Sequence, residues 1–193
     1  MIKKLFISTI ALASAFAFSF NVDAHENERV HEVSKGESLY KIGQKYGVSV
    51  AHIKEVNSKS GNEIVPGETL TIPYSVTEQD KELLARLVEA EAKGESYAGK
   101  VAVATVVLNR VDSDLFPDSV KDVIYDGYQF SPVLNGSIND PASEDSKQAV
   151  NEALAYQGHD RGSLFFWNPD KASNAYLEGK EVTTIIDNHV FAR

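Results

Sequence analysis

The chain has 193 residues, of which 42% are hydrophobic, a formal net charge of −9 and no cysteine. This hydrophobic content argues against a disordered chain, and the length allows one or two domains. The negative charge makes nucleic acid and anionic lipid poor partners, so no nucleic-acid partner is expected. Without cysteine there is neither a disulfide framework nor a cysteine nucleophile, so hydrophobic cores must stabilise the fold.

The first 24 residues have the pattern of a secretory signal peptide. Lys3 and Lys4 precede an uncharged, mostly apolar run at 5–20, and Val22 and Ala24 are small residues at the −3 and −1 positions of a cleavage site. The apolar run is shorter than the roughly 20 residues of a membrane-spanning helix. We expect export, cleavage after Ala24 and no membrane insertion afterwards. Because the removed segment carries two lysines and one aspartate, the net charge would become −10.

Residues 31–74 predict a strand, two short helices and a second strand. The first helix follows Ser38, which can cap it, and ends at Gly47. The second starts near Ser49, and a turn at Pro66-Gly67 leads into the last strand. The positions expected to be buried are Leu39, Ile42, Tyr46, Val50, Ile53, Val56, Leu70 and Ile72.

Two stretches of this segment, "HEVSKGESLYKIGQKYGVSVAHIKEVN" and "IVPGETLTIP", closely resemble the LysM domain. The resemblance implies binding to glycans that contain N-acetylglucosamine, such as peptidoglycan. The family's sugar groove lies between the loop after the first strand and the loop before the last strand. Here those loops would offer Gly36, Glu37, Ser38, Ile64, Val65, Pro66 and Gly67.

A linker at 75–79 is expected to lead to a larger domain at 80–193. Thr77 and Asp80 form a variant of the capping box, so a helix should run from there to about Ala92. A second, buried helix is expected at 96–111, which is apolar nearly all round. The elements expected after it are a short helix capped near Asp118, an extended segment at 128–138 with a turn at Asn135-Gly136, a surface helix at 142–157, a strand at 163–169 and a final strand or pair of strands at 181–193.

Glu91 interrupts the apolar stripe of the first long helix of this domain. Leu87 and Val88 point to one face, and Glu91 continues that face at the helix end, whereas Glu89 lies off it and is expected to be solvated. A glutamate beside apolar side chains loses hydration, which favours the neutral acid that can donate a proton to a leaving oxygen. From the pattern alone, the alternative is a carboxylate that reaches water or pairs with Arg110.

Four stretches, "LLARLVEAEAKGESYAGKVAVATVVLNRV", "YQFSPVLNGSI", "SLFFWNP" and "NHVFAR", resemble the cell wall hydrolases of the SleB/CwlJ type, the spore-cortex-lytic family. The resemblance implies a mainly helical, lysozyme-like domain, akin to resuscitation-promoting factors, with a small β lobe. Together with a small βααβ LysM module, the fold class is then α+β. The family's catalytic acid is the first glutamate of E-A-x-G-E, which is Glu91 here, and Glu95 is expected to support the site.

The implied reaction is cleavage of the bond between N-acetylmuramic acid and N-acetylglucosamine. No second acid stands out at an inward position, because Asp126, Asp140 and Glu144 have the surroundings of turn or cap residues. This favours a lytic transglycosylase, in which a single glutamate acts as acid and then as base and leaves a 1,6-anhydro sugar. The residues expected to contact the sugars are Gln129, Ser131, Trp167 and Asn168.

Two other functions stay open from the sequence. An N-acetylmuramoyl-L-alanine amidase would need clustered zinc ligands, but the larger domain has only His159 and His189, so no metal or other cofactor is expected. A non-catalytic wall-binding protein is disfavoured by the intact motif. We therefore expect a secreted monomer, associated with the cell wall or with spores, that acts on peptidoglycan glycan strands. Spore cortex and vegetative wall are both open as substrates.

Overall fold

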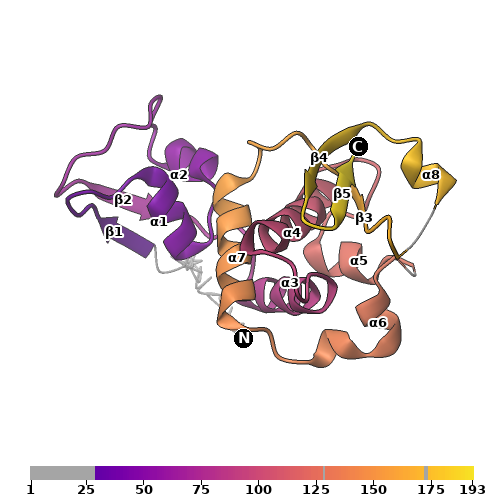
Figure 1. The fold of residues 1–193 in the computed structure, drawn as a ribbon. Helices are drawn as coiled ribbons and strands as arrows, with labels where there is room; N and C mark the ends of the chain where they lie inside the picture. The colour runs from indigo at the N-terminus through magenta and orange to yellow at the C-terminus, as the bar shows by residue number, and fades with distance from the viewer. Residues whose placement is uncertain (1–28, 128, 172–173) are drawn as a thin grey trace, which may run out of the picture.

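A computed structural model describes residues 29–127, 129–171 and 174–193. The predicted signal peptide lies outside these residues. No helix in the described ranges combines the length and the apolar character that a membrane crossing requires. Figure 1 shows a small N-terminal module, residues 29–74, beside a larger and mainly helical domain that carries a three-stranded sheet.

The N-terminal module has the predicted order of strand, helix, helix and strand. Its strands, β1 (Arg29–Glu32) and β2 (Thr69–Ile72), pair antiparallel, and α1 (Leu39–Tyr46) and α2 (Val50–Val56) share a core with them. The core residues are Val33, Leu39, Ile42, Val48, Ile53, Leu70 and Ile72. Val56 was predicted to be buried but is 42% exposed, because it is the last residue of α2 and lies beyond the helix face that meets the core.

The larger domain is built on α3 (Glu78–Glu91) and α4 (Tyr97–Val111). α7 (Glu144–Tyr156) packs against both, and α5 (Val120–Tyr125) also contacts both. Since α4 is apolar on nearly every side, it needs neighbours all round, which these helices and the sheet supply. The shared core includes Leu84, Leu87, Val88, Val103, Val107, Ile124, Leu154 and Phe191.

Side chains and glycines at the helix ends confirm several predicted boundaries. The hydroxyls of Ser38, Ser49 and Thr77 each accept a hydrogen bond from the backbone N–H three residues further on, at the starts of α1, α2 and α3. Gly47 ends α1 with a φ of 61°, and Gly94 has a φ of 88° shortly after α3. Both glycines adopt left-handed conformations, which other residues rarely do.

Residues 131–139 are helical, whereas an extended segment was predicted. They form α6 (Ser131–Asn135) and a 3-10 turn, η1 (Ser137–Asn139). Pro132 lies in the first turn of α6, where its missing N–H costs no intrahelical bond, and Gly136 ends α6 with a φ of 85°. The predicted break at Asn135-Gly136 is present, but it ends a helix.

α7 has the exposed polar side expected of a surface helix, at Glu144, Asp145, Lys147 and Gln148, but its other sides are buried. Ala149, Ala153 and Leu154 are each 0% exposed. α7 packs on α3 and α4 with one face and on α1 of the N-terminal module with another. In Figure 1, α7 stands between the N-terminal module and the remaining helices.

A close helix approach and one carboxylate join the N-terminal module to α7. A Cβ on Gly43 would lie 3.1 Å from the Cβ of Ala155 in α7 and 2.7 Å from the backbone oxygen of Val48 within the module. Glycine therefore permits this close approach of α1 to α7. Glu152 of α7 accepts hydrogen bonds from the Tyr40 hydroxyl (2.8 Å) and the Gln44 amide (2.9 Å) of α1. These contacts fix the orientation of the module on the domain.

The sheet contains β3 (Phe165–Trp167), β4 (Val182–Ile186) and β5 (His189–Ala192), all antiparallel, in the order β3-β5-β4. The C-terminal segment is therefore a hairpin of two strands, one of the arrangements that the sequence allowed. A short helix that the pattern did not predict, α8 (Ala175–Glu178), lies between β3 and β4.

We predict that Glu152→Ala lowers the free energy of unfolding by about 1 kcal/mol, because several neutral donors lose their shared charged acceptor near the surface. Urea denaturation followed by circular dichroism measures the change. Glu63→Ala, at an exposed loop position, is the control and should change stability by less than about 0.5 kcal/mol. Equal effects of the two substitutions would contradict the role of Glu152.

Candidate active site

Glu91 is the last residue of α3 and is half-buried, while its helix neighbours Leu87 and Val88 are fully buried. Burial raises the pKa of Glu91 above its ordinary value and is the largest influence on it. Hydrogen bonds from the backbone N–H and the hydroxyl of Ser131, and the charge of Lys171, lower the pKa by smaller amounts. The net shift is upward, so the neutral acid persists to higher pH than in a solvated glutamate.

Glu89 has the opposite surroundings, although it lies two residues away on the same helix. Its Oε2 accepts hydrogen bonds from the hydroxyls of Ser143 and Ser146 at the start of α7, which lower the pKa of Glu89. The expectation that Glu89 is simply solvated is therefore wrong, since it caps a neighbouring helix. The pKa values of these two carboxyls are therefore shifted in opposite directions by their different surroundings.

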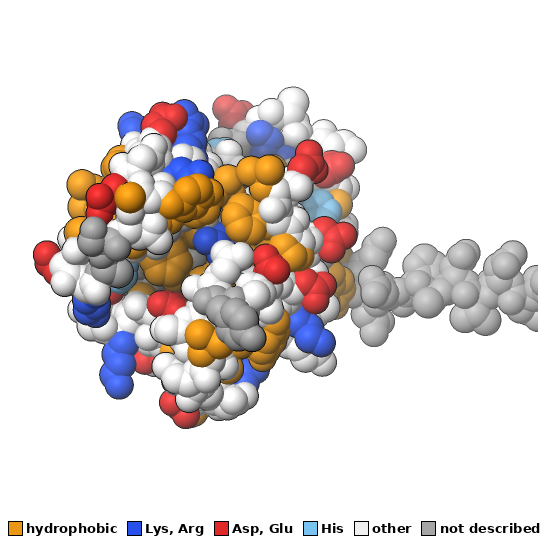
Figure 2. All heavy atoms as spheres, turned by 90° about the vertical axis from the view of Figure 1, so that its right-hand side faces the viewer, with side chains coloured by type: hydrophobic (Ala, Val, Ile, Leu, Met, Phe, Trp, Pro, Cys, Tyr) orange, Lys and Arg blue, Asp and Glu red, His pale blue; other side chains and the backbone are white. Residues whose placement is uncertain are grey.

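Glu91 lines a cavity of about 650 Å³, a size common for ligand sites. Its walls come from the end of α3, from α4, the start of α6, β3, β5 and α8. Figure 2 views this side of the molecule and shows hydrophobic side chains around a hollow, with acidic and basic side chains near it. The predicted site residues that line this cleft are Glu91, Gln129, Ser131, Trp167 and Asn168.

Arg110 of α4 joins several walls of the cleft. Its Nε donates to the Leu164 carbonyl (2.8 Å) and one terminal nitrogen donates to Oε1 of Gln129 (2.9 Å). Its guanidinium carbon lies 4.8 Å and 5.3 Å from the ring centres of Phe116 and Phe130. Burial lowers the pKa of Arg110 to about 10, which leaves it charged at neutral pH. Neutral acceptors and aromatic rings thus replace the glutamate partner that the sequence allowed.

Gln129 and Ser131 make hydrogen bonds to other residues of the protein around the cleft. The Gln129 amide is held at both ends, by Arg110 at Oε1 and by the Asp126 carboxylate at Nε2 (3.1 Å). Ser131 hydrogen-bonds the Glu91 carboxyl. Both residues were predicted to contact sugars, and the structure gives each a partner in the protein as well.

Glu95 does not line the cleft but contacts a residue that does. Its side chain is 6% exposed, and Oε1 lies 3.6 Å from Nδ1 of His189. The Asn188 N–H donates to Oε2 of Glu95 (3.4 Å), and the Ser96 N–H donates to Oδ2 of Asp187 (2.9 Å). The β4–β5 turn is therefore attached to the loop between α3 and α4.

Lys171 and Tyr176 also line the cleft, although the sequence pattern did not mark them. Tyr176 of α8 is 63% exposed, and its ring meets Phe165 edge-on at 6.1 Å between ring centres. No local sequence pattern marks these two residues, because only the course of the chain after β3 brings them to the cleft. Tyr176 supplies a phenolic hydroxyl that the aromatic run of β3 lacks.

The two loops predicted to form the glycan groove of the N-terminal module are adjacent, since the Gly67 N–H donates to the Val33 carbonyl (2.8 Å). Glu37 is engaged within the module, because Oε2 contacts Nε2 of His31 (2.7 Å) and accepts from the Ser34 N–H (2.8 Å). The other predicted groove residues on these loops are Gly36, Ser38, Ile64, Val65 and Pro66.

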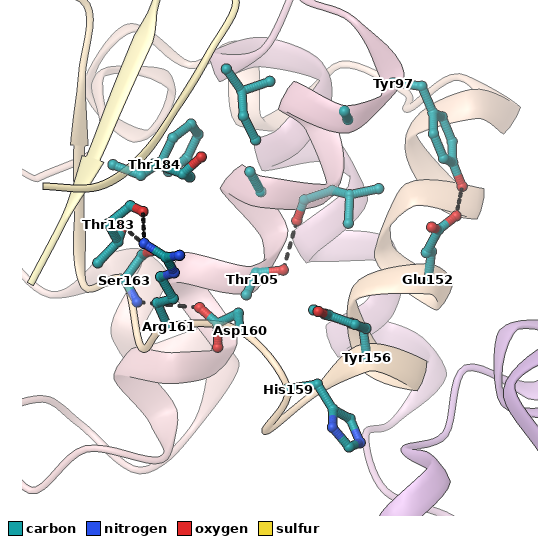
Figure 3. A pocket seen from close by; sticks show the side chains of 15 residues that line it. Tyr97, Thr105, Glu152, Tyr156, His159, Asp160, Arg161, Ser163, Thr183 and Thr184 are labelled. Atoms are coloured by element: carbon teal, nitrogen blue, oxygen red, sulfur yellow. Dashed lines mark hydrogen bonds between the residues drawn. The ribbon is translucent and has the colours of Figure 1, made fainter.

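A second cavity, of about 580 Å³, lies between α4, α7 and β4 and contains none of the predicted site residues. Figure 3 shows the Tyr97 hydroxyl against the Glu152 carboxylate on one side and Arg161 reaching the backbone of Thr183 on the other. Since Glu152 also holds α1, this cavity borders the junction with the N-terminal module.

Two family models match the chain. The one described as LysM domain matches residues 31–73, and the one described as Cell Wall Hydrolase matches residues 94–192. The second match begins after Glu91 and includes both Glu95 and His189.

Spore cortex-lytic enzymes of Halalkalibacterium halodurans and Bacillus subtilis are each 37% identical to the chain over 120 residues, 62% of its length. The matched parts cover 36% and 39% of those relatives, so the chain spans well under half of their length.

Two solved structures also match. The catalytic domain of the Bacillus cereus SleB protein is 34% identical, with a TM-score of 0.58 over 63% of this chain and 95% of that one. The catalytic domain of the germination-specific lytic transglycosylase SleB from Bacillus anthracis is 33% identical, with a TM-score of 0.59 over 63% of this chain and all of that one. These matches confirm the predicted fold class.

We predict that Arg110→Lys lowers the free energy of unfolding by about 2 kcal/mol, because a lysine cannot donate to Leu164 and Gln129 in the same geometry and leaves a buried acceptor unpaired. Urea denaturation measures the loss. Arg86→Lys is the matched control, since Arg86 donates a long hydrogen bond (3.4 Å) to a backbone carbonyl of its own helix. An Arg110→Lys variant as stable as the Arg86→Lys variant would refute this role.

Proposed function

Because the chain belongs to the Cell Wall Hydrolase family, we propose that it cleaves the glycosidic bond between N-acetylmuramic acid and N-acetylglucosamine in peptidoglycan. The raised pKa of Glu91, at the wall of a cavity of ligand size, carries the proposal. A carboxyl whose neutral form is favoured by burial can supply the proton that the leaving oxygen needs.

Glu91 is the one carboxylate among the described residues that line the cleft. Ordinary glycosidases place two carboxylates across the bond, whereas a lytic transglycosylase can use one. Glu91 protonates the leaving oxygen as the glycosidic bond breaks. Its carboxylate then takes the proton of the muramic 6-hydroxyl as that oxygen bonds to the anomeric carbon. The products are a 1,6-anhydro sugar end and a free hydroxyl end, and no water is consumed. The likeness to the catalytic domain of the Bacillus anthracis lytic transglycosylase supports this route.

Side chains around the cleft are suited to hold a sugar chain. Trp167 and Tyr176 bring aromatic rings, and Lys171 and Asn168 bring polar groups, to the same cavity as Glu91. Of these, Tyr176 is well exposed and can stack on a sugar ring, whereas Trp167 is 9% exposed and forms part of the wall.

The N-terminal module would bind the glycan through the loops around Gly36 and Gly67 and raise the local substrate concentration. The module docks on α7, while α6 and α8, which border the cleft, lie on the opposite side in Figure 1. The two sites would therefore engage separated parts of the wall. We propose that the protein is exported and works in the cell wall or on spores, as the first 24 residues and the names of its relatives suggest.

The amidase alternative has less support. The described residues contain no group of three or more His, Asp or Glu side chains placed to hold a metal ion. His159 and His189 line different cavities. A purely wall-binding protein would give no reason for a half-buried acid with a raised pKa beside a cavity.

We predict that Glu91→Gln abolishes digestion of purified peptidoglycan and leaves wall binding unchanged, because glutamine keeps the shape but has no proton to give. The variant should be at least as stable as the wild type at pH 7, since burial disfavours the ionised carboxylate. Glu82→Gln, on the same helix and 41% exposed, is the control and should retain activity.

Mass spectrometry of the wild-type digest on spore cortex and on vegetative wall identifies the reaction. Anhydromuramic ends are expected. Reducing ends in place of anhydromuramic ends would show that the enzyme hydrolyses the bond. Freed peptides with intact glycan would show that it is an amidase. Digestion that persists in Glu91→Gln would place the acid elsewhere.

We also predict that Ser131→Ala shifts the basic limb of the pH–rate profile to higher pH. Activity requires protonated Glu91, so the rate falls as pH rises through the pKa of that carboxyl. The Ser131 hydroxyl lowers this pKa by hydrogen-bonding the ionised form, so its removal raises the pKa. The pH dependence of kcat/KM on solubilised glycan measures the shift, and a limb that moves to lower pH would contradict it.

A further inference from the structure

His189 and Glu95 form a buried pair to which the proposed reaction gives no role. Their side chains are 8% and 6% exposed, and Nδ1 of His189 lies 3.6 Å from Oε1 of Glu95. Among the described residues, Nδ1 is one of two buried side-chain polar atoms that have no hydrogen-bond partner. A buried polar atom without a partner carries a free-energy cost, so its presence beside a reaction site calls for a functional explanation.

The orientation of the imidazole is fixed by aromatic packing. Phe166 meets the ring of His189 edge-on at 5.6 Å, and Phe191 lies 6.3 Å away between ring centres. Nδ1 faces Glu95 and is fully buried, yet His189 lines the cleft. Of the two ring nitrogens, Nε2 is therefore the one that can face the cleft.

Glu95 has one carboxylate oxygen available for this imidazole. Its Oε2 accepts from the Asn188 N–H, whereas Oε1 faces Nδ1 of His189. Asp187 is the other carboxylate near the ring, and its Oδ2 is occupied by the Ser96 N–H. The charged groups on the cleft side are Glu91, Arg110 and Lys171.

Gly99 of α4 makes room for this arrangement. A Cβ at Gly99 would lie 3.1 Å from the Cβ of Glu95 and 3.1 Å from Oδ2 of Asp187. The loop after α3 and the β4–β5 turn therefore pack directly against α4 at Gly99. This packing holds the carboxylate of Glu95 next to the imidazole of His189.

We propose that Glu95 accepts a hydrogen bond from Nδ1–H of His189, so that Nε2 carries a lone pair and accepts a hydrogen bond from an N–H or O–H group of the glycan in the cleft. A 3.6 Å contact needs only a small closure to become direct, and such bonds commonly tighten when substrate binds. Glu95 is then a positioning residue, and His189 touches the substrate. The identity of the ligand rests on the proposed function.

This role complements the other groups in the cleft. Lys171 and Arg110 can only donate hydrogen bonds, so the acceptors for the acetamido N–H and the hydroxyls of the sugars must come from other side chains of the cleft, and His189 is one of them. A histidine supplies an acceptor only in the neutral tautomer whose other nitrogen carries the proton, and a carboxylate behind the ring selects that tautomer.

The tautomer is measured directly in the full chain by two-bond proton–nitrogen correlation spectra of ¹⁵N-labelled protein at pH 7 and pH 8. We expect His189 to carry its proton on Nδ1 alone. The exposed His159 serves as an internal reference, and His189→Phe identifies the signals. A proton on Nε2, or on both nitrogens, would overturn the proposal whether or not the protein digests wall.

Kinetics test the contact with the glycan. In Glu95→Gln the amide N–H donates to Nδ1 and moves the proton to Nε2, so a donor replaces the acceptor. We expect kcat/KM to fall roughly 10- to 100-fold, the usual result of leaving a buried hydrogen-bonding group unpaired. His189→Phe, which keeps an aromatic ring against Phe166, should lose as much, and the double variant no more than either single variant.

Independent, additive losses, or full activity in either single variant, would overturn the coupling. If Glu95→Gln fails to fold, the wild-type spectra still decide the tautomer. If the wild-type protein has the Nδ1–H tautomer but does not cleave glycan, the proposed function is contradicted, while the hydrogen bond between Glu95 and His189 is supported. Cleavage with a different tautomer would refute the pair alone.

Discussion

The balance between desolvation and hydrogen bonding at Glu91 is the constraint on which the site depends. Full solvation would give an ordinary carboxylate, and full burial would remove the acid from substrate. The end of α3 places the carboxyl against a helical core, while Ser131 at the start of α6 limits the cost of ionisation. Glu89 shows how local this balance is, because two serine hydroxyls shift its pKa in the opposite direction.

The rest of the domain keeps this balance in place. Arg110 spans the cleft walls with hydrogen bonds and ring contacts, so that β3 and the segment before α6 hold their positions around Glu91. On the other side of the core, α7 packs against α3 and α4 and also carries the N-terminal module. The helix that completes the core of the larger domain is thus also the helix that holds the N-terminal module.

Local signals in the sequence predicted most elements, because caps, left-handed glycines and apolar spacing act over a few residues. The hydroxyl caps at Ser38 and Thr77 are of this kind, and so is the position of Glu91 on the apolar face of its helix. The role of α7 could not be predicted in this way, since its second apolar contact is with a distant part of the chain. The placement of Tyr176 and the pairing of His189 with Glu95 also depend on tertiary structure, because each joins segments that no local pattern relates.

The most direct test of the central claim is the pKa of the Glu91 side chain, measured by a ¹³C NMR titration of the carboxyl carbons, with the Glu91→Gln variant identifying the signal. The account predicts a midpoint above the ordinary glutamate value of 4.5. A midpoint at or below 4.5 would show that burial does not favour the neutral acid at Glu91, which would contradict the account.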